Sequence, residues 1–117
     1  MQPTTAEEVQ QIVELLVPNE VPFAIRSGGH SPSPGAANIN NGVLIDLAAL
    51  NEITYDASSG TVTVGAGNKW GDVYKALDPY KVTAVGARDL DVGVGGFLLQ
   101  SACMRSLVSI DTIPFTG

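Results

Sequence analysis

The sequence has few of the residues that carry several common functions. It contains one cysteine, one histidine and six basic residues among 117, and its formal net charge is −6. A lone cysteine excludes an intramolecular disulfide, and Cys103 with His30 falls short of the four ligands of a structural zinc site. Six scattered cations are too few to follow a nucleic-acid backbone. We therefore expect no metal site and no nucleic-acid partner.

Long apolar runs are missing as well. No stretch approaches the roughly 18 apolar residues of a membrane span, and the N-terminus "MQPTTAEEVQ" lacks the basic and apolar regions of a signal peptide. Hydrophobic residues still make up 44% of the chain and charged residues 15%, which is typical of a globular protein. The sequence predicts one soluble domain with a modest core and no membrane contact, and it leaves the cellular location open.

Helical periodicity occurs twice. Thr5 and Glu8 have the spacing of a capping box, and Pro18 ends the apolar pattern that follows them. The apolar positions of this first helix are Val9, Ile12, Val13 and Leu16. A second helix is predicted from Asn68, the expected N-cap, to Pro79. Its apolar positions are Trp70, Val73, Tyr74 and Leu77.

Short strand patterns separate and follow these helices. Strands are predicted at 23–26 ("FAIR") and within 81–87 ("KVTAVGA"), and a hairpin at 53–64 ("ITYD", the turn "ASSG", then "TVTV"). Residues 42–47 ("GVLIDL") are too apolar for an edge strand with one face in water, so we expect a buried strand there. The tail from residue 100 to 117 has no clear period, and the sequence predicts no element in it.

The only histidine follows two glycines at the end of a strand pattern, in "RSGGH" at 26–30. Consecutive glycines can adopt positive φ, so their N–H groups can converge into a nest that binds an anion. Ser27 and Ser31 add hydroxyl donors and Arg26 adds a cation, which suits a pyrophosphate group. The same residue types also form ordinary surface turns, and the residues alone leave that alternative open.

His30 has three candidate chemical roles. A serine hydrolase is disfavoured because the chain has no G-x-S-x-G turn for the nucleophile. A metal site lacks further ligands. The third role, a nucleophile toward a bound cofactor, requires an imidazole held beside that cofactor by a rigid loop. A glycine nest directly before the histidine favours this third role.

A second glycine cluster suggests a different nucleotide site. Residues 65–71 read "GAGNKWG", close to the dinucleotide fingerprint but with one extra residue before the last glycine. Asp89 and Asp91 lie roughly 20 residues further on, where a ribose-binding acid is expected. Rossmann crossovers link parallel strands, however, whereas the strand before these glycines belongs to the predicted hairpin. A nicotinamide-dinucleotide-binding domain is kept as an alternative, beside a purely structural role for these glycines.

Four stretches, in order and spacing, resemble a known family. They read "VPFAIRSGGHSPSPGA", "GVLIDLAALNEITYD", "TVTVGAGNKWGDVYKAL" and "DVGVGGFLL". From about Pro3 to Leu99 they resemble the N-terminal FAD-binding region of FAD-linked oxidases of the p-cresol methylhydroxylase (vanillyl-alcohol oxidase) type, most nearly the berberine-bridge-enzyme-like branch. The resemblance implies an α+β fold, with small mixed sheets and flanking helices, that is the N-terminal and incomplete part of such a domain.

The resemblance also implies a cofactor and its site. The cofactor is FAD, its pyrophosphate is cradled by the amides of residues 27–31, and His30 bonds covalently to the 8α-methyl carbon of the flavin. Gly86 and the glycines of "VGVGG" line the adenosine and pyrophosphate side, and "GAGNKWG" becomes a structural joint. No catalytic residue is expected. The expected cofactor-binding residues are Arg26, Ser27, Gly28, Gly29, His30, Ser31, Gly86, Gly93, Gly95 and Gly96.

For domains and function, the resemblance implies a partial FAD-binding domain at 1–99, a divergent tail at 100–117 and no substrate domain. We expect a truncated FAD-linked oxidoreductase whose complete relatives oxidise a small-molecule substrate in secondary metabolism, with oxygen as acceptor, and which is inactive alone. A non-catalytic FAD-binding role is an alternative, as is a half-domain that pairs with a second chain supplying the missing half.

Overall fold

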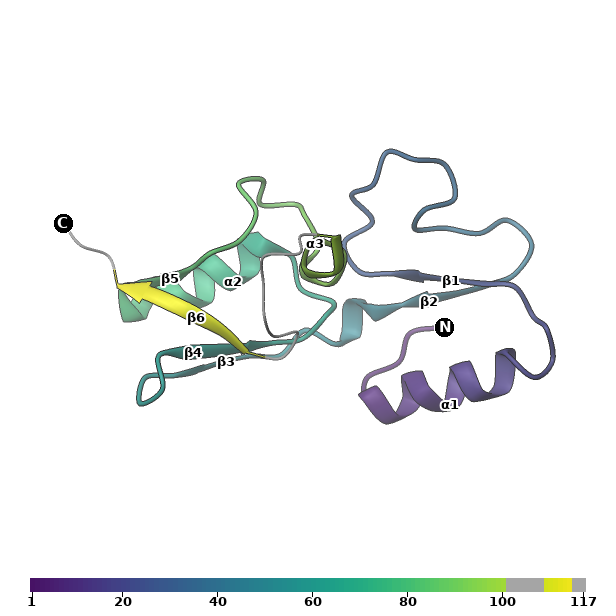
Figure 1. Cartoon of the computed structure of the whole chain (residues 1–117), viewed down its shortest axis with the longest axis horizontal. Helices are drawn as coiled ribbons and strands as arrows, with labels where there is room; N and C mark the ends of the chain where they lie inside the picture. The colour runs from purple at the N-terminus through teal and green to yellow at the C-terminus, as the bar shows by residue number, and fades with distance from the viewer. Residues whose placement is uncertain (101–108, 115–117) are drawn as a thin grey trace.

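Two separate sheets organise the chain, as Figure 1 shows. The structure is a computed structural model, and it describes residues 1–100 and 109–114. In chain order the elements are α1 (Ala6–Leu16), β1 (Phe23–Arg26), β2 (Val43–Asp46), the 3-10 turn η1 (Leu47–Ala49), β3 (Ile53–Asp56), β4 (Thr61–Val64), α2 (Trp70–Leu77), the 3-10 turn η2 (Asp78–Tyr80), β5 (Val82–Ala84), α3 (Val94–Gln100) and β6 (Ser109–Pro114). The predicted α+β class is confirmed.

The first sheet is a parallel pair of β1 and β2, with α1 lying beside it (Figure 1). Parallel strands need a crossover connection, and here the glycine- and proline-rich segment 27–42 supplies one without a helix. The expectation of a buried strand at 42–47 is only partly met, because Ile45 alone is fully buried. The reason is the small sheet: among the described strands, β2 pairs with β1 alone.

Helix α1 begins as its capping signal predicts. The Thr5 hydroxyl accepts a hydrogen bond from the Glu8 N–H, which satisfies one of the free donors of the first turn. The Glu8 carboxylate accepts from the N–H and hydroxyl of Thr4, one residue earlier than in a regular capping box. Of the predicted apolar face, Leu16 is buried and the other positions are half-buried.

The second sheet is antiparallel, with strand order β3-β4-β6-β5. The predicted hairpin is confirmed, since β3 pairs with β4 across the turn at 57–60. Strand β6 lies within the tail where the sequence predicted no element, and it inserts between β4 and β5. Residues 101–108 and 115–117 of that tail lie outside the described residues.

Helix α2 packs on this sheet and carries the main core. The predicted N-cap was wrong: the helix begins after Lys69, whose side chain makes no capping hydrogen bond. The buried Asn68 amide instead donates to the carbonyls of Glu52 at 3.3 Å and Gly65 at 3.0 Å, so it fastens the strand-to-helix joint. The buried core residues are Val62, Trp70, Val73, Leu77, Val82, Ala84, Ala87, Val94 and Leu98.

The glycines of "GAGNKWG" have a packing role. A Cβ at Gly65 would overlap the carbonyl group of Leu50, and one at Gly67 would overlap that of Leu47, so the segment approaches η1 closely only because these residues are glycine. The strand before them, β4, is antiparallel to both of its neighbours. A dinucleotide fingerprint requires a parallel βαβ unit, so the topology disfavours the nicotinamide alternative.

Gly86 packs against the core indole, which gives a test of the packing. A Cβ at this position would overlap the Trp70 ring, and the ring is fully buried and cannot move aside freely. We expect Gly86→Ala to lower the free energy of unfolding by about 1–3 kcal/mol, the scale of core overpacking. Urea unfolding checks this against Gly96→Ala, where the added methyl meets no atom within 4 Å. Equal unfolding midpoints for the two variants would contradict this packing.

The hairpin turn holds an unusually acidic carboxyl. Hydrogen bonds from Ser58 and Ser59 lower the pKa of Asp56 to about 2. Because the pKa of Asp56 is lower in the folded state than in the unfolded state, ionised Asp56 stabilises the fold at pH values above the unfolded-state pKa. This stabilisation is lost as the pH falls through the folded-state pKa of about 2. We expect Asp56→Ala to be less stable than wild type at about pH 6, with the difference closing near pH 2. A difference in unfolding free energy that does not vary with pH would refute the assignment.

Candidate cofactor site

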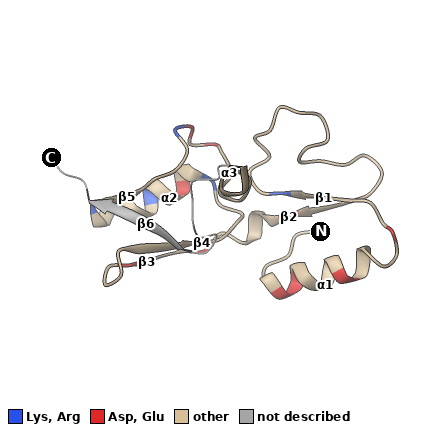
Figure 2. Cartoon of the chain, viewed as in Figure 1, with Lys and Arg blue, Asp and Glu red and all other residues tan. Residues whose placement is uncertain are grey.

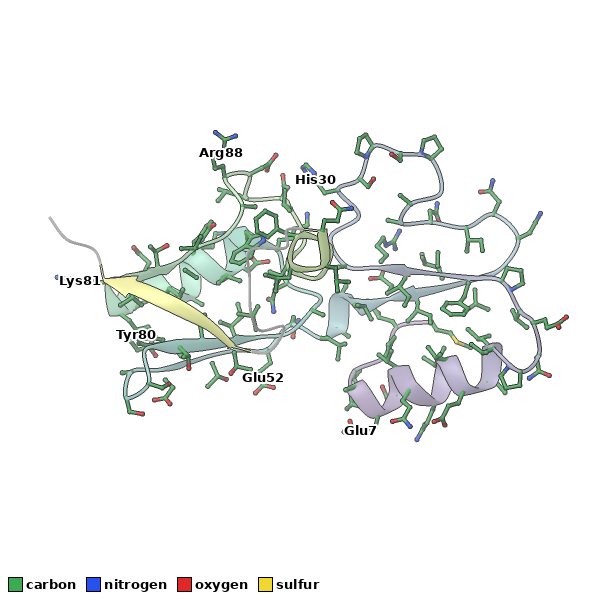
Figure 3. The ribbon with its side chains drawn as sticks, viewed as in Figure 1. Glu7, His30, Glu52, Tyr80, Lys81 and Arg88 are labelled. Atoms are coloured by element: carbon green, nitrogen blue, oxygen red, sulfur yellow. The ribbon has the colours of Figure 1, made fainter. Side chains whose placement is uncertain are left out.

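A cleft of about 640 Å³ lies where the loop after β1 meets the segment that leads into α3. Figure 3 shows His30 on this loop, beside α3. The walls are mostly backbone and apolar side chains, with residues contributed from both sheets. The residues lining the cleft are Ile25, Ser27, Gly28, Gly29, His30, Ser31, Pro32, Ala36, Ala37, Leu47, Val64, Ala66, Val92, Gly93, Val94, Gly95, Gly96, Phe97, Leu98, Leu99 and Gln100.

Two backbone segments meet within the lining of the cleft. A Cβ on Gly28 would overlap the backbone of Gly93, and a Cβ on Gly93 would overlap that of Gly28, so glycine is required on both sides. Ser27 secures the same joint: its hydroxyl donates to the Ala66 carbonyl at 2.6 Å and accepts from the Gly95 N–H at 3.2 Å. The loop is thereby fixed to two segments that are distant in sequence.

The loop offers unpaired backbone donors. In the part of the chain that the structure describes, the N–H groups of Gly28, Gly29, His30 and Ser31 make no hydrogen bond. Gly29 lies in the left-handed region, at φ 65°, as expected in a nest. Because buried or ligand-facing amides are normally paired, such a run of free donors suits an anionic ligand.

The charge around the loop agrees with an anion site. Figure 2 shows the connection between β1 and β2 without charged residues, and among the residues that the structure describes no Asp or Glu lines the cleft. Although the net charge of the chain is −6, the carboxylates of residues 1–100 therefore lie off these walls. The donors and the lack of repelling charge fit a pyrophosphate group.

The imidazole of His30 has one hydrogen-bond partner among the described residues. Its Nε2 lies 3.2 Å from Oδ2 of Asp89, on the segment between β5 and α3. Oδ1 of Asp89 accepts the N–H of Asp91 at 3.0 Å. That hydrogen bond is the main cause of a lowered pKa of Asp89, and the nearby His30 adds to it, so Asp89 is a carboxylate at neutral pH.

The structure brings together eight of the ten residues predicted from the sequence, namely Ser27, Gly28, Gly29, His30, Ser31, Gly93, Gly95 and Gly96. Arg26 and Gly86 lie outside the lining. The Arg26 guanidinium pairs with Asp46 at 2.6 Å because the parallel register sets these residues side by side, and this hydrogen bond lowers the pKa of Asp46. Gly86 contacts Trp70 instead.

Sequence reasoning missed the contributions of Ala66 and Asp89. Ala66 accepts the Ser27 hydrogen bond across 39 positions of sequence, and its only signal was a place between two glycines that approach a neighbouring backbone. Asp89 was considered as a ribose ligand, whereas the structure sets it against His30. Among the described residues no cluster of side chains could hold a metal ion, and no helix is long and apolar enough to cross a membrane; Cys103 lies outside those residues.

The fold and this cleft, with its unpaired amide donors, fit a nucleotide-cofactor-binding domain. The profile of the FAD binding domain family matches residues 1–110. The chain belongs to this family, of the p-cresol methylhydroxylase type, and FAD is its cofactor. The match runs past residue 99, and the predicted division of the chain at that point stays a prediction.

Several fungal proteins are similar to the chain in sequence. FAD-dependent monooxygenase macF of Penicillium terrestre is 53% identical over 98 residues, which cover 83% of this chain and 19% of macF. FAD-dependent monooxygenase yanF of Aspergillus niger is 47% identical over 98 residues, which cover 83% of this chain and 17% of yanF. The chain therefore spans about a fifth of the length of these relatives.

Solved structures share the fold. 6-Hydroxy-D-nicotine oxidase from Arthrobacter nicotinovorans superposes with a TM-score of 0.74 at 29% identity, over 79% of this chain and 20% of the oxidase. The berberine-bridge-enzyme-like protein 1 of Physcomitrella patens gives 0.69 at 34% identity, over 81% of this chain and 21% of that protein. The family resemblance found in the sequence is confirmed.

The Ser27 hydroxyl provides a test of how the cleft is held. Ser27→Ala leaves the Ala66 carbonyl and the Gly95 N–H without their partner in a partly buried joint. We expect the unfolding free energy to fall by about 1–3 kcal/mol, the cost of leaving such groups unsatisfied. Denaturant titration measures it, with Ser33→Ala in the same loop as the control because that residue is exposed. Similar losses in both variants would show that the joint does not depend on Ser27.

Proposed function

We propose that this chain is the FAD-holding part of an FAD-linked oxidoreductase, with the FAD pyrophosphate at the amides of residues 27–31. The observation that carries this proposal is the run of unpaired N–H groups from Gly28 to Ser31 on a cleft wall without carboxylates, within the part of the chain that the structure describes. Backbone donors on glycine admit a phosphate without steric obstruction, and their dipoles favour its charge. Gly93, Gly95 and Gly96 form the facing wall.

His30 is proposed as the covalent attachment point of the flavin, through its 8α-methyl carbon. It follows the nest directly, lines the cleft, and its Nε2 lies 3.2 Å from Oδ2 of Asp89. A nucleophile attached to a rigid phosphate-binding loop is held at a constant distance from the rest of the same cofactor. Bound flavin supplies two-electron redox chemistry, and the residues described here bind and orient it.

For the complete protein we propose oxidation of a small-molecule substrate by hydride transfer to the flavin, with dioxygen as acceptor, in secondary-metabolite biosynthesis. The names of macF and yanF, both FAD-dependent monooxygenases, support the redox class. CrmK, a structural neighbour at 29% identity, is a flavoenzyme of caerulomycin biosynthesis. Because the chain spans about a fifth of these relatives, we expect no turnover of substrate by this polypeptide alone.

A second candidate is a half-domain that binds FAD only together with another chain. The exposed apolar residues at the cleft favour it: Leu99 is 74% exposed and Ile25 is 47% exposed, and both line the cavity. Apolar side chains on a ligand-binding wall are normally covered. Covalent flavin in the isolated chain would exclude this candidate.

Replacing the histidine tests the proposed attachment. Wild type, His30→Ala and the loop control Ser33→Ala are expressed with FAD available, and flavin absorbance and intact mass are measured after acid precipitation. We expect flavin to stay with wild type and Ser33→Ala and to be lost from His30→Ala, because acid removes cofactor that is bound only non-covalently. Flavin retained by His30→Ala would overturn the attachment at His30, and flavin absent from a folded wild type would favour the half-domain that needs a second chain.

A further inference from the structure

The carboxylate of Asp89 is oriented by a hydrogen bond that is independent of His30. One oxygen, Oδ1, accepts the Asp91 N–H at 3.0 Å, which leaves Oδ2 to face Nε2 of the imidazole at 3.2 Å. His30 and Asp89 are separated by 59 positions in sequence; His30 lines the cleft, whereas Asp89 is not among the lining residues. Both side chains are about half-exposed, at 48% and 60% for His30 and Asp89, so the contact adds little stability and its significance lies in orientation.

This contact determines which ring nitrogen is free. An ionised carboxylate can only accept hydrogen bonds, so the neutral imidazole must carry its proton on Nε2 to satisfy it. Nδ1 then keeps its lone pair. Among the described residues Nδ1 has no hydrogen-bond partner. The two neighbouring cations do not compete with His30 for the Asp89 carboxylate. Lys69 pairs with Asp91 at 3.2 Å, and Arg88 has no ion-pair partner in the same set of residues.

We propose that Asp89 is a positioning residue that holds His30 as the Nε2–H tautomer and so presents Nδ1 as the nucleophile toward the flavin. This inference rests on the proposed function, in which His30 is the attachment point. Carboxylate partners that fix the tautomer and direction of a histidine ring are a common device at reactive sites.

Attachment is a two-electron oxidation of the 8α-methyl carbon. Nδ1 forms a bond to the 8α-methyl carbon, and that carbon loses one proton while the electron pair of its C–H bond enters the flavin. The alkylated ring is a cation, which the Asp89 carboxylate stabilises until Nε2 releases its proton. Dioxygen takes up the two electrons with the two released protons, forming hydrogen peroxide and restoring oxidised flavin.

The test uses Asp89→Asn with Asp91→Asn as its matched control. In Asp89→Asn the side-chain amide retains an oxygen for the Asp91 N–H but turns an NH₂ donor toward Nε2, which favours the opposite tautomer with the proton on Nδ1. Asp91→Asn removes the same charge two residues away, where the side chain contacts Lys69 and not His30. Both positions are exposed, so both variants should fold.

Two measurements are made on the full chain. Ring ¹⁵N spectra of flavin-free protein report the tautomer, and they need no assignment because His30 is the only histidine. Covalent flavin is followed over time after FAD is added to the same protein. We expect Nε2–H in wild type and Asp91→Asn, a shift toward Nδ1–H in Asp89→Asn, and attachment slowed by roughly 10- to 100-fold in Asp89→Asn alone, the scale of lost histidine-orienting partners.

The outcomes separate this inference from the function on which it rests. Attachment at the wild-type rate in Asp89→Asn, or an unchanged tautomer, would overturn the role of Asp89 while leaving His30 as the attachment point. Equal slowing in both variants would also overturn it, because the effect would then follow from charge alone. No covalent flavin in any protein, wild type included, would overturn the proposed attachment, and the positioning role with it.

Discussion

The contact between the backbones of Gly28 and Gly93 joins the half of the chain built on β1 and β2 to the half built on the antiparallel sheet. Neither position has room for a side chain, so the two segments are closer than any other pair of residue types would allow. Ser27 adds hydrogen bonds to the same joint from a position next to the glycine. Both glycines line the cleft, so their contact sets how closely its two sides approach.

Electrostatics follow the same arrangement. The chain is acidic overall, yet the carboxylates of residues 1–100 lie on α1, on the hairpin and at other positions outside the lining of the cleft (Figure 2). Arg26 is the cation nearest in sequence to the glycine nest. It pairs with Asp46 because the parallel register sets these two residues opposite each other. Binding of an anion here would rely on backbone dipoles, which carry no side-chain entropy and do not titrate. Asp89 is the acidic group that contacts the loop, and it does so through the histidine.

Patterns between residues close in sequence predicted most of the helices and strands. The features that the sequence did not predict depend on contacts between residues far apart in the chain. The Thr5 cap, the hairpin and the strand at "FAIR" each depend on neighbours in sequence, and each is found. Asn68 has the residue type of an N-cap, but burial turns its amide toward two carbonyls. The glycines of the nest were identified because glycine has a local signature. The His30 contact with Asp89 has none, since it depends on how two loops meet after folding.

The place of β6 in the second sheet has a kinetic consequence. It is the last described strand in the chain, yet it lies between β4 and β5 and pairs with both. Until it arrives, β4 and β5 both have an edge of unpaired backbone groups, and the loop that must close between β4 and β6 is long. During synthesis the N-terminal parallel pair can form early, whereas the sheet under α2 has to wait for residue 114 to leave the ribosome. The interval between those two events is when this chain is most exposed to chaperones and to aggregation.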